Sequence, residues 1–70
     1  MQWDKCIKYW NIYSKYKETA EQHEFLTLLL LDSYLTPRYK SLINNFDEEK
    51  GVKFIKGMEI VFKKLGIDYD

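Results

Sequence analysis

Few residues in this sequence have the types and spacing that metal binding or catalysis requires. His23 is the only histidine, and Glu21 and Glu24 lie beside it in the sequence. A metal site needs three or more converging ligands, and on a helix His23 does not lie one turn from both carboxylates. Cys6 falls on a face that we expect to be apolar, where a thiol keeps a high pKa and stays unreactive. We therefore expect no metal site and no nucleophilic cysteine.

The serines are no better placed for chemistry. Ser14 and the pair Asp32 and Ser33 have no histidine at the spacing of a hydrolase motif. The sequence contains no phosphate-binding loop, and a single cysteine excludes an internal disulfide. We predict a non-enzymatic protein without cofactor or metal.

The composition predicts one small domain, residues 1–70. The chain is 46% hydrophobic and 17% aromatic, and eleven basic residues balance eleven acidic ones. A chain of this length buries only about 60% of the surface that its unfolded form exposes, so its stability is marginal without a partner. The zero net charge gives no general sign of nucleic-acid or membrane binding. A protein partner, either a second copy or a larger protein, is therefore expected.

Two further features concern location. The N-terminal residues lack the basic segment and apolar run of a signal peptide, and the longest apolar run is far shorter than the about 20 residues that cross a bilayer. We expect a cytoplasmic protein with no membrane contact. Ten lysines against one arginine are typical of an A/T-rich genome, which suggests a phage or another mobile element.

The most apolar stretch, Phe25 to Leu31, predicts the centre of the fold. At about 100° per residue its large side chains occupy every side of a helix. A helix that is apolar all round is normally buried. We expect an all-α fold, a small three- to four-helix bundle around this buried central helix.

Periodicity and capping residues predict the first two helices. Residues 3–16 form an amphipathic helix with an aromatic half. Thr19, followed three residues later by Gln22, fits the start of the central helix. One continuous helix over residues 3–31 remains the alternative.

The last two helices are indicated by proline, glycine and capping residues. Pro37 predicts a break after the central helix and a short third helix over residues 37–46. Asn45 or Asp47 caps the fourth helix, which ends at Gly66. The fourth helix has the clearest separation of apolar and lysine-rich faces.

The aromatic half of the first helix is the candidate protein interface. Two tryptophans and three tyrosines share one arc, which exceeds what one flanking helix covers in so small a bundle. The alternative is that these rings only cover the core. The interface candidates are Trp3, Tyr9, Trp10, Tyr13 and Tyr16.

The expected 37–46 helix carries an alternative function. A helix, a turn and a second helix that exposes arginine and asparagine resemble in outline a helix-turn-helix that reads DNA bases. The zero net charge and the acidic residues at 47–49 argue against it, so we prefer protein association as a homo-oligomer or as a regulator or inhibitor. The nucleic-acid candidates are Arg38, Lys40, Ser41, Asn44 and Asn45, with phosphate contacts from Lys53 and Lys56.

Overall fold

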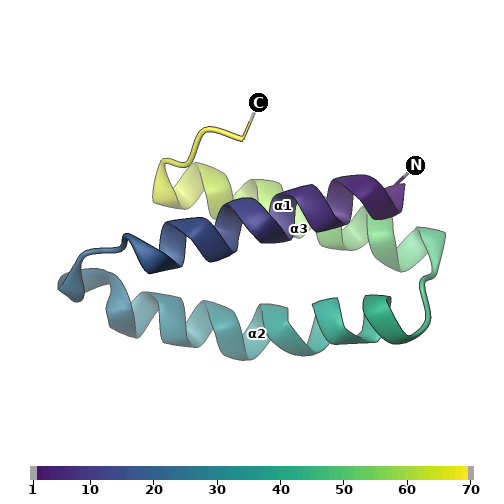
Figure 1. Cartoon of the computed structure of the whole chain (residues 1–70), viewed down its shortest axis with the longest axis horizontal. Helices are drawn as coiled ribbons and strands as arrows, with labels where there is room; N and C mark the ends of the chain where they lie inside the picture. Colours follow the sequence, from purple (N-terminus) through teal and green to yellow (C-terminus); the bar gives the residue numbers. More distant parts are fainter. Residues whose placement is uncertain (1, 70) are drawn as a thin grey trace.

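The computed structural model describes residues 2–69 and contains three α-helices (Figure 1). The helix α1 spans Gln2–Glu18, α2 spans Phe25–Asn44 and α3 spans Glu48–Leu65, while a short 3-10 turn, η1, covers Gln22–Glu24. α1 packs most extensively on α3, and α2 runs alongside them. The prediction of an all-α fold is confirmed for the described residues, which contain no strand.

Residues 3–31 form two helices and not one continuous helix, because α1 ends at Glu18 and α2 begins at Phe25. The backbone N–H of Thr19 donates to the Tyr16 carbonyl at 3.1 Å, and the Thr19 hydroxyl donates to the same oxygen at 3.2 Å. Thr19 therefore ends α1, and the prediction that it starts the next helix is wrong. The backbone N–H of Glu21 instead donates to the Glu24 carboxylate at 3.2 Å and opens η1.

Pro37 lies inside α2 and does not begin a third helix. The helix continues through the expected turn, so the predicted break and the separate short helix are wrong. Proline lacks the N–H that would bond the Ser33 carbonyl, but Ser33 and Pro37 are both exposed, so the missing bond lies on the solvent side of the helix and not in the core. One continuous helix also buries Leu35 and Leu42 on the same side, and this burial outweighs the local preference before proline.

The ends of α3 confirm the predicted capping residues. The Asp47 side chain accepts hydrogen bonds from the backbone N–H groups of Glu49 at 2.8 Å and Lys50 at 3.4 Å. Gly66 ends the helix with φ of 73°, a left-handed conformation that glycine adopts without steric cost. Its buried residues are Gly51, Phe54, Ile55, Met58, Val61 and Phe62.

The core lies between α1 and α3 and is closed by one stripe of α2. In α2 the buried residues are Leu28, Leu35 and Leu42, which recur every seven residues and so share one side of the helix. The Trp10 ring of α1 stacks on the Tyr39 ring of α2, with centroids 4.4 Å apart. Aromatic stacking therefore joins α1 to the buried stripe of α2.

The expected buried central helix is a further correction. Phe25, Leu26, Leu29 and Leu30 are 56 to 70% exposed, whereas Leu28 is only 5% exposed. A helix is covered on every side only if other helices surround it. α1 and α3 both lie on one side of α2 (Figure 1), so the opposite side of α2 has no neighbour among the described residues.

Candidate functional site

The five aromatic residues predicted as an interface pack inside the bundle. Tyr9 and Tyr13 are buried, and Trp3, Trp10 and Tyr16 are half-buried against the core. The aromatic half of α1 faces both other helices, which together cover more of it than one flanking helix would. Three of the five residues therefore keep part of their surface exposed, and their role as a protein interface stays a prediction.

Three tyrosines of α1 each donate a hydrogen bond to a carboxylate on a different element. Tyr9 bonds Glu59 of α3 at 3.0 Å, and Tyr13 bonds Asp32 of α2 at 2.6 Å. Tyr16 bonds Glu24 of η1. The three bonds fix α1 against each of the other elements. The spacing of the tyrosines at 9, 13 and 16 puts them on one side of α1 but does not identify their partners.

Asp32 takes part in the most connected of these contacts. It also accepts from the Lys17 ammonium at 3.1 and 3.3 Å, and that ammonium lies 5.1 Å from the centroid of the Tyr13 ring. Burial, and next the hydrogen bond to Asp32, raise the pKa of the Tyr13 hydroxyl. A phenol that retains its proton acts as a hydrogen-bond donor, so the bond from Tyr13 to Asp32 joins α1 to α2.

Cys6 and His23 lie in different environments. Cys6 is buried, as expected, with its sulfur 3.6 Å from the Gly51 carbonyl oxygen, and burial raises the pKa of its thiol. His23 is exposed on η1. Within residues 2–69 no three histidine, cysteine, aspartate or glutamate side chains are grouped so that they would hold a metal ion. No helix in that range combines the length and the apolar composition needed to cross a bilayer.

An exposed apolar surface covers the N-terminal half of α2. Among the described residues, seven large hydrophobic side chains are more than half exposed, and five of them lie within residues 25–34. Single exposed apolar residues are common, but a contiguous group is typical of an interaction site. We call this group the α2 outer face: Phe25, Leu26, Leu29, Leu30 and Tyr34.

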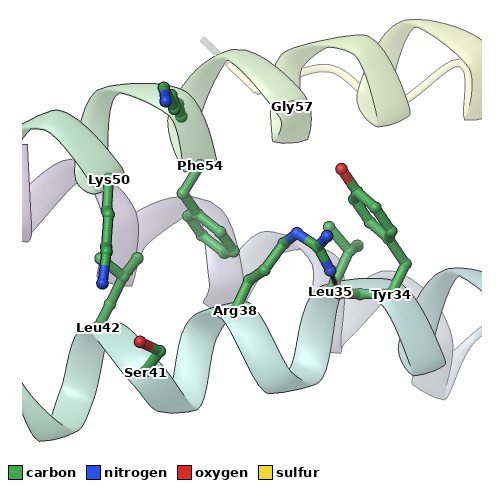
Figure 2. A pocket seen from close by; sticks show the side chains of 9 residues that line it. Tyr34, Leu35, Arg38, Ser41, Leu42, Lys50, Phe54 and Gly57 are labelled. Atoms are coloured by element: carbon green, nitrogen blue, oxygen red, sulfur yellow. Dashed lines mark hydrogen bonds between the residues drawn. The ribbon is translucent and has the colours of Figure 1, made fainter.

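Two hollows follow one another along the groove between α2 and α3. The first has a volume of about 380 Å³, and Figure 2 shows Phe54 pointing into it from α3 while Tyr34 and Arg38 extend from α2 toward α3. The second hollow measures about 300 Å³. The first is lined by Tyr34, Leu35, Arg38, Ser41, Leu42, Lys50, Lys53, Phe54 and Gly57, and the second by Thr27, Leu30, Leu31, Val61, Lys64 and Leu65.

Three of the seven residues predicted to contact nucleic acid line one hollow. Arg38, Ser41 and Lys53 line the first hollow. The Arg38 guanidinium donates to the Tyr34 carbonyl at 2.7 Å and lies 3.6 Å from the centroid of the Tyr34 ring. The remaining candidates are exposed outside that hollow: Lys40, Asn44, Asn45 and Lys56.

Sequence reasoning missed both the α2 outer face and the groove. Leu28, Leu35 and Leu42 are spaced by seven residues, but in the apolar run from Phe25 to Leu31 this spacing does not single out Leu28 over Leu26 or Leu29 as the buried residue. Comparison of the chain with protein-family models, with curated proteins and with solved structures gave no match. The α2 outer face and the groove are therefore the two candidate binding surfaces of this protein.

Proposed function

We propose that this small protein acts in the cytoplasm through protein–protein association, with the α2 outer face as its interface. The observation that carries this proposal is the gathering of five large side chains, each at least 55% exposed, within residues 25–34. Covering such a face removes apolar area from water, at about 25 cal/mol per Å². A second chain on this face is the direct way to gain that free energy.

The size of the gain indicates what kind of partner is needed. Full burial of a leucine or phenylalanine side chain contributes about 1.5 to 3 kcal/mol, and these side chains start 55 to 70% exposed. Association costs about 4 kcal/mol or more in lost freedom of motion. The free energy is favourable only if most of the face is covered together, which requires a protein surface of comparable length.

The partner is a second copy of this chain, which gives a homo-oligomer, or a larger protein that this chain regulates or inhibits. We propose no catalytic role, because the best-connected polar groups, around Asp32 and Glu24, bond α1 to its neighbours. The DNA-binding alternative is less well supported. Arg38 is engaged with Tyr34, and the turn that would set off a recognition helix is helical.

Sedimentation of a charge-matched pair of variants tests this proposal. The double variant Leu26→Glu and Leu29→Glu places two carboxylates on the α2 outer face, while Lys8→Glu makes the same net charge change on the exposed side of α1. We expect the wild type and Lys8→Glu to form dimers or larger species at micromolar concentration. The double variant should be monomeric with unchanged helical circular dichroism.

If the wild type is monomeric, the larger-partner version is tested by affinity capture from the native host. It requires a protein that the wild type and Lys8→Glu retain and that the double variant loses. If the wild type neither self-associates nor retains such a protein, the proposal is contradicted. The nucleic-acid alternative predicts that the wild type and the double variant retard genomic DNA at low salt and that Lys53→Glu does not.

A further inference from the structure

We propose that the groove between α2 and α3 binds an amphipathic helix of another protein, one whose apolar stripe is flanked by acidic residues. This inference rests on the proposed function in that the partner is a protein, and it names the chemistry of that partner. The groove shares Leu30 and Tyr34 with the α2 outer face, but Leu26 and Leu29 do not line it.

The dimensions of the groove fit a helix. The two hollows are lined by residues 27–42 of α2 and 50–65 of α3, so they extend along most of both helices. At about 1.5 Å per residue, each wall is about 24 Å long. Since α2 and α3 run antiparallel (Figure 1), a helix in this groove would take the fourth position of a four-helix bundle.

The floor of the groove is apolar. In the first hollow Leu35, Leu42 and Phe54 are buried at its base, and Figure 2 shows the Phe54 ring between the two helices. The second hollow adds Leu31 and Val61. A groove of this kind binds the apolar side of an amphipathic helix through side chains repeated every three or four residues.

The rim of the groove is basic. Lys50 and Lys53 line the first hollow and Lys64 the second, and none of the described lining residues is acidic. Arg38 also lines the first hollow, with its guanidinium held against Tyr34. Lys53 lies 3.7 Å from Glu49, but both side chains are almost 80% exposed, where an ion pair contributes little and is easily exchanged. Charge complementarity therefore favours carboxylates on the bound helix.

Gly57 in the groove wall supports close approach by another chain. A Cβ at Gly57 would meet no atom within 4 Å, so no packing inside the molecule requires glycine there. Gly51 is different, since a Cβ would lie 2.8 Å from the Phe46 ring. Glycine inside a helix costs up to about 1 kcal/mol relative to alanine, and a wall without a side chain lets an external backbone approach.

A second copy of this chain fits the groove less well. The exposed sides of α1 and α3 carry more lysine than acid, three lysines against two acids in α1 and five against two in α3, so the basic rim would repel them on balance. α2 has exposed leucines, but its one acidic residue, Asp32, is already bonded to Tyr13 and Lys17. The chemistry of the groove therefore indicates a different protein.

A pair of synthetic helical peptides tests the chemistry of the bound helix. Each has about 18 residues, enough to span the groove, with leucine on one stripe and either glutamate or lysine on both flanks. Fluorescence anisotropy of the labelled peptide measures the Kd on the full chain. We expect the glutamate peptide to bind at least about tenfold more tightly than the lysine peptide and to weaken as salt is added. Equal binding of both peptides would overturn the proposal.

Variants of the groove then locate the site. Gly57→Leu places a side chain in the groove, and Lys53→Glu reverses a charge at its rim. Each should raise the Kd of the glutamate peptide about tenfold or more. Lys8→Glu, the same charge change on α1, should leave the Kd unchanged. Circular dichroism confirms that the variants keep their helical content.

The outcomes separate this proposal from the previous one. If the Leu26→Glu and Leu29→Glu double variant loses peptide binding and Gly57→Leu keeps it, the peptide binds the α2 outer face. The assignment of the site to the groove is then wrong. Self-association lost in Gly57→Leu would place a second copy in the groove and overturn the acidic partner. If the groove variants weaken peptide binding while the double variant self-associates like the wild type, the groove is supported as a binding site and the α2 outer face is not.

Discussion

At the scale of single residues, Tyr13 sets part of the response of this protein to pH. Burial, and then the bond to Asp32, raise the pKa of its hydroxyl above the ordinary tyrosine value of 10.0. Above that pH the unfolded chain has released this proton while the folded chain still holds it. The stability that Tyr13 contributes is therefore fully present below pH 10 and is lost as the pH rises further.

We predict that Tyr13→Phe lowers the free energy of unfolding by about 1.5 to 3 kcal/mol at neutral pH, because it removes a hydrogen bond to a charged partner. It should also make the loss of stability above pH 10 shallower. The slope should not vanish, since the pKa values of Tyr16 and Tyr39 are raised as well. Urea unfolding over a pH series measures both effects. Tyr34→Phe, at an exposed ring, is the control, and equal alkaline slopes for all three proteins would contradict the assignment.

Gly51 and Gly57 give opposite predictions for the same substitution. Gly51→Ala should destabilise the chain by about 1 to 3 kcal/mol, because its Cβ would lie 2.8 Å from the Phe46 ring, which is packed against Trp3. Gly57→Ala should stabilise the chain by up to about 1 kcal/mol through helix propensity. Thermal unfolding measures both, and a common sign for the two variants would be inconsistent with the packing described.

At the scale of elements, α2 shows how tertiary burial carries a helix through a proline. Its inner stripe runs from Leu28 to Leu42 and packs on both other helices, while Pro37 lies on the exposed side. The bond that Pro37 cannot make is lost where water reaches the backbone. The free-energy cost of the proline is therefore limited, whereas a break at Pro37 would expose part of the buried stripe from Leu28 to Leu42.

We predict that Pro37→Ala raises the free energy of unfolding by about 1 to 3 kcal/mol, because alanine supplies the missing N–H to the Ser33 carbonyl. If Pro37 began a separate helix, its fixed φ would suit that position and the replacement would be neutral or destabilising. Chemical denaturation distinguishes the two results. Ser41→Ala, also exposed on α2, controls for helix propensity alone and should change stability by only a few tenths of a kcal/mol.

At the scale of the whole molecule, the three helices are not equally protected. α1 and α3 share the most extensive contact, whereas α2 buries one stripe and exposes its outer face. Segments with few buried apolar contacts open locally at lower free energy than the rest of a domain. We therefore expect the N-terminal half of α2 to open before α1 and α3.

We predict that backbone amides of residues 25–34 exchange with solvent faster than those of α1 and α3 in the monomer. Their protection should increase with protein concentration if a second copy covers the α2 outer face, because binding stabilises the covered state. Hydrogen exchange followed by NMR or mass spectrometry measures this. Uniform protection of all three helices at every concentration would show that α2 is held as firmly as the others.

The sequence by itself determined the helical class, the amphipathic faces of α1 and α3, and the ends of α3. Gly66 could be identified, and the cap could be narrowed to Asn45 or Asp47, because such residues act on the backbone within a few residues of themselves. Cys6 could be placed inside because its helix has one distinct apolar half. Each of these features depends on local geometry or on a pattern with a single apolar direction.

The tertiary structure decided which side of α2 is covered, that α2 continues through Pro37, and that the α1 tyrosines bond acids on three other elements. An apolar run such as Phe25 to Leu31 has no polar side, so its pattern gives burial no direction. The α2 outer face and the groove are set by where α1 and α3 lie around α2. That placement is a balance among contacts distant in sequence, which no local spacing of residues encodes.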